Sequence, residues 1–400
     1  MTNKIINYSN IFLIIYLSSS FVGISMKGTI NLSIILLLLS INLIIKKNDV
    51  KFQSKDVFIF LLILLFTIST ILINGDQLFD YIIFYIVLIS AFFFSRIFSF
   101  ETFIHSYVKI IYFISVFSLL TFTVLVVAPS LLEIFPKYTN SVGLNVNNIF
   151  FSVTYNSTYF KSNYGLFWEP GAYQTFLNIS LFLELFIFEK IDVKRIIVLI
   201  VTILTTFSTT GYIGMILLII TYLVSITTIN SNNIKVIAVI IIAGISGFFL
   251  ISLLPDNIIF KLFGKLEILY NSSIYNNSSY ISTNIRMNSV KAVISSFIKN
   301  PFFGVGFSNL NKASYYFGGE GMLTATPLNW FGLYGAVVGV ILNYPLWSWT
   351  KFINKPLYIR LLVFSFFIII FLTENYTRNL FYLCFLFIGL STRKKKNEEK

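Results

Sequence analysis

Long apolar runs recur along the whole chain, and they restrict its fold more than any other feature of the sequence. Of the 400 residues, 56% are hydrophobic and only 11% are charged, and the mean hydropathy is +0.84. Apolar runs of about 17–25 residues have the length that an α-helix needs to cross a bilayer, where a helix satisfies its own backbone hydrogen bonds. The sequence therefore predicts an all-α polytopic integral membrane protein and excludes a soluble multidomain protein.

About twelve transmembrane helices are expected in a single membrane domain, residues 1–400. The expected spans are 7–25, 29–45, 57–73, 78–96, 107–127, 171–188, 196–209, 211–228, 235–254, 329–350, 357–373 and 377–391. The first run lacks the small-residue cleavage pattern of a signal peptide, so it is expected to remain as a helix.

Basic residues set the expected orientation of these helices. With the N-terminus in the cytoplasm, most of the 29 Lys and Arg residues fall in cytoplasmic segments, as the positive-inside rule requires. An even number of spans then places the basic tail, residues 392–400, on the same side. Both termini are therefore expected to be cytoplasmic. The net charge of +13 is explained by this topology, and no nucleic-acid partner is expected.

Two long extracytoplasmic loops are expected, at residues 129–170 and 254–328. Within the second loop, residues 258–270 are expected to lie flat in the membrane interface. Residues 271–284 are rich in Asn, Ser and Tyr, which indicates a surface loop.

Several chemistries are excluded by what the sequence lacks. A single cysteine, Cys384, and a single histidine, His105, leave no disulfide framework and no Cys- or His-based metal site. The chain also lacks the GxxxxGK[ST] phosphate loop and a DxD-like acidic cluster outside the membrane. No metal and no cofactor are therefore expected. A reaction here needs a substrate that is already activated and lipid-borne, with cationic side chains facing its diphosphate leaving group.

Residues 282–310 form the longest polar excursion that carries positive charge in the expected extracytoplasmic region. Its first half predicts an amphipathic helix, which Asn300-Pro301 should end. Gly304 and Gly306 then permit a tight turn. The apolar face of the predicted helix consists of Val290, Val293, Ile294, Phe297 and Ile298.

Arg286, near the start of this helix, has two interpretations. It could contact lipid headgroups or a loop carboxylate, which is the ordinary role of an exposed arginine. Alternatively, its forked guanidinium could bind a phosphate or diphosphate. The turn at Gly304 and Gly306 could bring backbone N–H groups to the same anion.

Glu169, in the segment GLFWEPGAYQ at 165–174, is the second candidate. Phe167 and Trp168 flank it at the expected entrance to a span, and a carboxylate desolvated in this way suits proton transfer. The alternative is an acid that favours the N-terminus of a helix beginning at Pro170.

Three further polar sites are less specific. The Ser-Thr-Thr-Gly segment at 208–211 is typical of a polar hairpin between two spans. Glu374 and Arg378 could form an ion pair, or Arg378 could be a second contact for an anion. Asn329 and Trp330 open a span, where tryptophan is common at the membrane interface.

Taken in order, four motifs resemble the O-antigen ligase/polymerase superfamily, and most closely the Wzy-type O-antigen polymerases. They are FWEPGAYQTFLN at 167–178, the hairpin at 208–211, Arg286 followed by NPFFGVGFSN at 300–309, and LNWFGLYG at 328–335. The resemblance implies a GT-C-like fold in the bacterial cytoplasmic (inner) membrane. It also implies metal-independent, inverting glycosyl transfer at the outer face of that membrane.

The resemblance also implies roles for individual residues. Arg286 and Glu169 would be catalytic, with Arg286 on the diphosphate and Glu169 near the acceptor hydroxyl. Gly304 and Gly306 would shape the loop beside the diphosphate. The residues expected to bind substrate are Tyr173, Tyr212, Gly304, Gly306, Asn329 and Arg378.

The chain departs from the superfamily pattern in two places. Ligases usually have His-Asn where this chain has Pro327-Leu328-Asn329, and many relatives have Ser-Arg-Gly where this chain has Ser-Thr-Thr-Gly. The first departure favours a polymerase over a ligase, and the second removes a cation.

The function implied is polymerisation of O-antigen, capsule or exopolysaccharide repeat units carried on undecaprenyl diphosphate. The expected partners are the lipid-linked oligosaccharide, membrane lipids, a chain-length regulator and a flippase. Two alternatives remain at this point. One is an O-antigen ligase that transfers glycan to lipid A core. The other is a flippase for lipid-linked glycan, which would require charged residues within the spans, where this chain has few.

Overall fold

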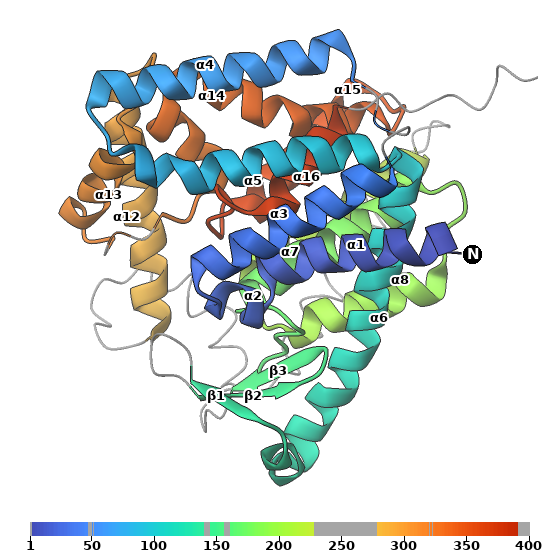
Figure 1. Cartoon of the computed structure of the whole chain (residues 1–400). Coiled ribbons are helices and arrows are strands. Elements are labelled where there is room, and N and C mark those ends of the chain that lie inside the picture. The colour runs from blue at the N-terminus through green and yellow to red at the C-terminus, as the bar shows by residue number, and fades with distance from the viewer. Residues whose placement is uncertain are drawn as a thin grey trace, which may run out of the picture.

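The computed structural model describes residues 2–46, 50, 52–139, 145–155, 161–227, 278–319, 321 and 323–390. The expected span at 235–254, the expected interfacial segment at 258–270 and the basic tail at 392–400 lie outside these residues. Figure 1 shows the described elements as a bundle of helices with a small sheet at one side.

Each expected span other than the one at 235–254 overlaps a described helix. The helices are α1 (Thr2–Ser19), α2 (Phe21–Ser25), α3 (Gly28–Ile45), α4 (Ser54–Asn74), α5 (Leu78–Ile97), α6 (Phe100–Val127), α7 (Pro170–Phe182), α8 (Val193–Thr205), α9 (Thr209–Thr227), α12 (Ser278–Lys299), α13 (Gly306–Tyr316), α14 (Thr326–Lys351), α15 (Leu357–Phe371) and α16 (Leu380–Gly389). A short 3-10 helix, η1 (Pro129–Ile134), follows α6, and a π-helical turn, η2 (Leu183–Ile187), extends α7.

Five of the described helices are long and apolar enough to cross a membrane: α3, α4, α6, α9 and α14. Three shorter apolar helices lie in α5, α15 and α16. The outward face of α4 exposes Phe58, Leu65 and Leu72, which recur every two turns and would be costly to leave in water. The protein is therefore embedded in a membrane.

The interior of the bundle is built on α16 and α7. Every residue of α16 is buried, and α16 packs against α5, α14 and α1. Its Phe385 ring stacks on Trp349 of α14 with ring centres 4.5 Å apart. Residues from Ala172 to Phe182 of α7 are also buried. Both helices lead directly into the polar segments described below.

The first apolar run is not one helix, as was expected for 7–25. It breaks at Ser20, whose hydroxyl accepts a hydrogen bond from Gly23 N and caps α2. Ser20 pairs with Phe167 as an isolated bridge, and Phe21 N donates to Leu166 O at 2.9 Å. At the break, the backbone of residues 20–21 pairs with the segment that precedes α7.

The expected loop at 129–170 contains a three-stranded antiparallel sheet, so the all-α prediction is incomplete. Its strands are β1 (Lys137–Thr139), β2 (Asn145–Ile149) and β3 (Ser152–Tyr155), in the order β1-β2-β3. Asn148 lies opposite Val153 in the β2–β3 register. Val153 N donates to Gly165 O at 2.6 Å, which ties the sheet to the same pre-α7 segment.

The span expected at 329–350 is not a single straight helix. At Gly335 the backbone leaves the helical region, with φ 79° and ψ −173°, and two helical arms meet there. The arms fold back far enough for Asn343 Nδ2 to donate to Pro327 O at 2.8 Å. Ala336 N then donates to Pro301 O, so the bend is fastened to the segment after α12.

The second expected loop, 254–328, contains α12 and α13. Helix α12 begins at Ser278, so the surface loop predicted for 271–284 is wrong over its last residues. It ends at Lys299, before Pro301, as predicted. In Figure 1, α12 runs across the direction of α4 and α5, at the end of the bundle opposite the N-terminus.

The buried face of α12 differs from the predicted apolar face. Val293 is buried against α14, whereas Ile294 and Ile298 are 50% and 72% exposed. Ser289, Ala292 and Ser296 complete the buried stripe instead, because small side chains allow α12 to lie close to α14.

Candidate functional site

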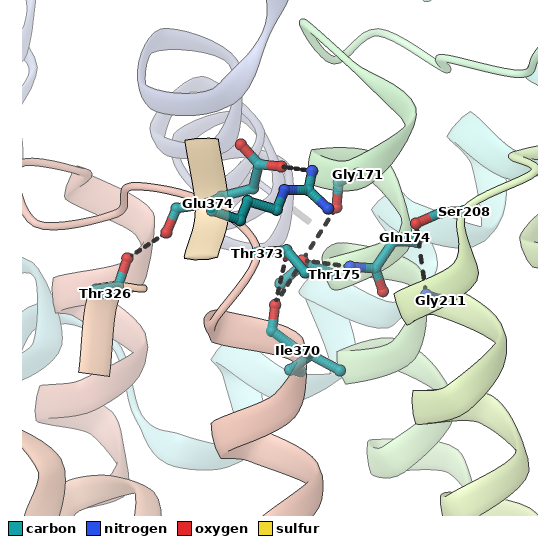
Figure 2. Close-up of polar contacts among 10 residues, drawn as sticks. Gly171, Gln174, Thr175, Ser208, Gly211, Thr326, Ile370, Thr373 and Glu374 are labelled. Atoms are coloured by element: carbon teal, nitrogen blue, oxygen red, sulfur yellow. Dashed lines mark hydrogen bonds and ion pairs between the residues drawn. The ribbon is translucent and has the colours of Figure 1, made fainter. Parts of the chain in front are cut away.

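Three polar segments meet at the end of the bundle where α12 lies. They are the residues that lead into α7, the face of α12 that carries Arg286, and the connection between α15 and α16. Arg286 Nη2 lies 3.7 Å from Glu374 Oε1, with the arginine side chain 33% exposed and the glutamate side chain 10% exposed. Figure 2 shows Glu374 between Gly171 and Thr326.

Gly171 shows that Glu169 and Glu374 point into the same space. A Cβ atom placed on Gly171 would lie 2.7 Å from Glu374 Oε1 and 3.0 Å from Glu169 Oε1. The two carboxyl groups therefore occupy the volume that a side chain at position 171 would fill. Glycine follows Glu169-Pro170 because the carboxyl pair leaves no room for a larger residue.

The backbone that carries Glu374 is held by Thr326, the first residue of α14. Thr326 Oγ1 donates to Glu374 O at 2.5 Å (Figure 2). It also accepts from Tyr376 N at 2.6 Å. Thr373 Oγ1 donates to Ile370 O at 3.0 Å on the preceding turn. These bonds fix the backbone at Glu374 relative to both α14 and α15.

The Ser-Thr-Thr-Gly segment packs against α7 beside this site. Asn178 Nδ2 donates to Gln174 Oε1 at 3.0 Å and to Gly211 O at 3.1 Å. A Cβ on Gly211 would meet Gln174 Cβ at 2.8 Å, so glycine allows the close approach seen in Figure 2. Ser208 lies in the connection between α8 and α9, and the other three residues of the predicted hairpin form the start of α9. The segment braces the helix that follows Glu169.

The surroundings of Glu374 favour its protonated form. Burial raises the pKa of Glu374 well above its ordinary value, and the charge of Glu169 and a hydrogen bond with Glu169 raise it further. Arg286 and the side chain of Trp168 act in the opposite direction. The site thus combines two close carboxyl groups with a partly exposed guanidinium, which is an arrangement suited to proton transfer next to an anion.

Glu169 occupies the backbone position that its alternative interpretation requires. It is the N-cap residue of α7, and Pro170 is the first helical residue. Its side chain makes no capping hydrogen bond with the described backbone and turns toward Glu374 instead. The Glu169 carboxyl group therefore lies next to Glu374, the ion-pair partner of Arg286, and does not cap the helix.

The turn at Gly304 and Gly306 has the conformation expected from the sequence, with φ +66° and +75°. Its N–H groups bond within the protein: Gly304 N to Asn300 O, Val305 N to Gly332 O at 2.9 Å, and Phe307 N to the Tyr81 hydroxyl. A Cβ on Gly304 would overlap the backbone of Leu333. The turn fastens α12 to the bend of α14. The positive φ angles and the close packing explain why glycine is present at both positions.

Gly304→Ala is expected to lower the thermal stability of the purified protein strongly, because the new Cβ would overlap the Leu333 backbone. Gly75→Ala is the matched control, since Gly75 also has a positive φ, +63°, but has nothing within 4 Å of its Cβ position. The control should lose only about 1–2 kcal/mol, through its left-handed backbone conformation. Equal melting temperatures for the two variants in detergent would show that the turn does not pack as described.

Two of the remaining predicted residues, Tyr173 and Tyr212, bond to helices other than their own. Tyr173 is fully buried, and its hydroxyl lies 2.9 Å from Ser118 Oγ on α6. The Tyr212 hydroxyl donates to Leu204 O of α8 at 2.6 Å. Both tyrosines are thus engaged with other helices.

Asn329 makes a polar contact, and Arg378 packs on an aromatic ring. Asn329 is buried one turn after Thr326, and its Nδ2 lies 3.5 Å from Thr324 O. Arg378 lies over the Phe307 ring at 4.1 Å, and Glu374 pairs with Arg286 rather than with Arg378. The ion pair suggested by the sequence spacing is therefore corrected.

Sequence reasoning missed Gly171 and Thr326, and it did not place Glu374 in the site. The one available signal was that Glu374 is an acidic residue in a short polar turn between two apolar runs. Within the described residues, no group of three or more His, Cys, Asp or Glu side chains is arranged to hold a metal ion.

Comparison with known proteins gives a match over the part of the chain that contains Arg286. Residues 196–341 match the family model described as O-antigen ligase. The match covers less than half of the chain, from α8 to the first part of α14's second arm. It supports the O-antigen ligase/polymerase superfamily, whose members are glycosyltransferase-like membrane enzymes. It includes Arg286 and the Gly304–Gly306 turn and leaves out Glu169 and Glu374. No curated protein and no solved structure matched the chain.

Proposed function

We propose that this protein is a polysaccharide polymerase that joins repeat units carried on undecaprenyl diphosphate. The observation that carries the proposal is the meeting of Arg286, from the segment that matches the family, with the carboxyl groups of Glu169 and Glu374. The reaction would be inverting and independent of metal ions and cofactors.

Arg286 is suited to receive the leaving diphosphate. A third of its side chain is exposed, and its contact with Glu374 is long, at 3.7 Å, so an incoming anion can reach the guanidinium. The planar fork of arginine donates two parallel hydrogen bonds to phosphate oxygens. Charge that develops on the departing diphosphate would be stabilised at this position.

Glu169 is suited to accept the proton of the attacking hydroxyl. It is only partly buried, in contrast to Glu374, and it lies beside Trp168 at the start of α7. In the proposed reaction, the non-reducing end of a lipid-linked repeat unit attacks the anomeric carbon of the donor glycan. The growing chain moves onto that unit, and free undecaprenyl diphosphate remains at Arg286.

A ligase is the second candidate, because the matching family model carries that description. The position of the single histidine favours a polymerase. His105 lies on α6, stacks on Phe188 and contacts Glu101 at 3.6 Å. His105 therefore makes its contacts elsewhere and does not replace the histidine that ligases usually carry at the position of Pro327-Leu328-Asn329.

The proposed setting is the bacterial cytoplasmic membrane, with both termini in the cytoplasm and the site at its outer face. A flippase would deliver the lipid-linked units, and a chain-length regulator would limit the product. Membrane lipids would surround the exposed apolar faces of α4 and its neighbours.

A deletion strain separates the candidate functions. Loss of a polymerase is expected to leave single repeat units on the lipid carrier in the outer leaflet and on the cell surface. Loss of a ligase would instead accumulate lipid-linked polymer, and loss of a flippase would hold single units in the inner leaflet. Gel electrophoresis of the surface glycan and extraction of carrier lipids would distinguish these outcomes, and either of the last two would reject the polymerase.

A further inference from the structure

Glu374 is a buried carboxyl group to which the reaction described above gives no task. Its side chain is 10% exposed, and it faces Glu169 and Trp168 from the start of α7, Arg286 from α12 and Tyr376 from its own connection. Thr326 holds its backbone from α14. A carboxyl group buried this deeply, beside a second one, needs a physical explanation.

The charges in this small space are unequal in number. Two carboxylates face one guanidinium, and both Oε1 atoms lie within 3.0 Å of the Cβ position of Gly171. Like charges at such short range in a desolvated site disfavour double ionisation, so the pair favours a state in which one of the two carboxyl groups is protonated. The question is which of the two glutamates carries it.

Burial assigns the proton to Glu374. The Glu374 residue is almost fully buried, whereas Glu169 is partly exposed at the start of its helix. An ionised carboxylate pays the larger desolvation penalty at the more buried position. Arg286 is the cation that opposes this distribution by favouring an ionised Glu374.

We propose that Glu374 is the proton-holding partner of Glu169, and that diphosphate binding at Arg286 fixes the proton on Glu374. This role rests on the proposed function. A diphosphate on the guanidinium withdraws the charge that stabilises ionised Glu374 and adds negative charge nearby. Glu374 then holds its proton more tightly, and Glu169 remains the ionised carboxylate beside the acceptor.

The acceptor oxygen forms a bond to the anomeric carbon while the bond from that carbon to the diphosphate oxygen breaks. The electron pair of the broken bond goes to the diphosphate, which Arg286 contacts. The hydroxyl proton goes to Glu169, which releases it to water when the product leaves. Glu374 keeps its own proton throughout and acts as a positioning residue.

The first test compares Glu374→Gln with Glu169→Gln in polymerisation assays over a range of pH. Glutamine copies the protonated acid, so Glu374→Gln should lose about tenfold in rate, the worth of one altered hydrogen bond. Glu169→Gln should lose far more, about 10²–10⁴-fold, because a base is removed.

The pH profile gives a readout that a merely structural role would not change. The pKa of Glu374 is raised, so its proton is lost as the pH increases through that value, and activity of the unmodified enzyme should fall on the alkaline side. Glu374→Gln cannot lose this proton and should lack that decline. An unchanged alkaline decline, or a loss as large as that of Glu169→Gln in a folded variant, would overturn the role of Glu374.

The second test measures protons taken up on binding. Farnesyl diphosphate, a soluble polyprenyl diphosphate, would be titrated into the full-length protein in detergent, in two buffers of different ionisation enthalpy between pH 6 and 9. The unmodified protein should take up more protons than Glu374→Gln, and equal uptake at every pH would overturn the proposal.

An Arg286→Ala sample in the same titration distinguishes a failure of the proposed function from a failure of the role of Glu374 alone. If farnesyl diphosphate binds equally well without Arg286, the anion site and the proposed function fail. If binding requires Arg286 but proton uptake does not depend on Glu374, only the role of Glu374 fails.

Discussion

Arg286→Ala is expected to stop glycan extension, so that cells carrying only this variant display single repeat units in place of a ladder. The substitution removes the exposed guanidinium that would stabilise the departing diphosphate, and it leaves Glu374 without its 3.7 Å partner. Loss of one such preorganised donor costs about 10²–10³-fold in rate. Gel electrophoresis of surface glycan, together with the rate of purified protein on lipid-linked units, would measure the effect.

Two variants on the same helix provide controls. Arg286→Lys keeps the charge but loses the planar fork, so it should retain an intermediate rate. Lys291→Ala lies on the exposed side of α12 and should leave the ladder intact. A ladder of normal length from Arg286→Ala would contradict the assignment of the diphosphate to this arginine.

Gly171→Ala is expected to inactivate the protein without unfolding it. The added methyl group would meet Glu374 Oε1 at 2.7 Å and Glu169 Oε1 at 3.0 Å, so the carboxyl pair must move apart. A displacement of about 1 Å at a reacting group can cost about 10²-fold in rate. Alanine is also a better helix former than glycine by about 1 kcal/mol, so the start of α7 should keep its stability.

Gly28→Ala is the matched control for this substitution. Gly28 also lies in the first turn of a helix, and a Cβ there would meet nothing within 4 Å. Both variants should melt close to the unmodified protein, and only Gly171→Ala should lose polymerisation. Full activity in Gly171→Ala would show that the carboxyl groups tolerate separation.

The helical framework could be predicted because bilayer-length apolar runs leave the backbone few alternatives. The breaks within the runs could not. Ser20 interrupts the first run through a hydroxyl cap and a strand-like contact with Phe167, which lies far away in sequence. Gly335 bends α14 because the segment after α12 docks against it. Both features depend on long-range contacts, and hydropathy does not record them.

Two charged residues of the candidate site could be predicted from the sequence, but the contact that joins them through Glu374 could not. Arg286 and Glu169 stood out because charge is rare in this chain and each lies in a distinctive motif. Glu374 has a nearer arginine in sequence, Arg378, which made a local pair the natural prediction. The fold instead places Glu374 beside Arg286, and Thr326 of α14 holds the backbone that carries Glu374.

Because α12 is fastened to the bend of α14, the direction in which Arg286 points depends on the number of residues between it and that anchor. Pro301 and Val305 bond to Ala336 and Gly332, so the end of α12 cannot turn about its own axis. One residue inserted or deleted between Arg286 and that anchor would swing the arginine by about 100° around the helix. Variation in length is thus barred from this stretch, even where its individual side chains tolerate exchange.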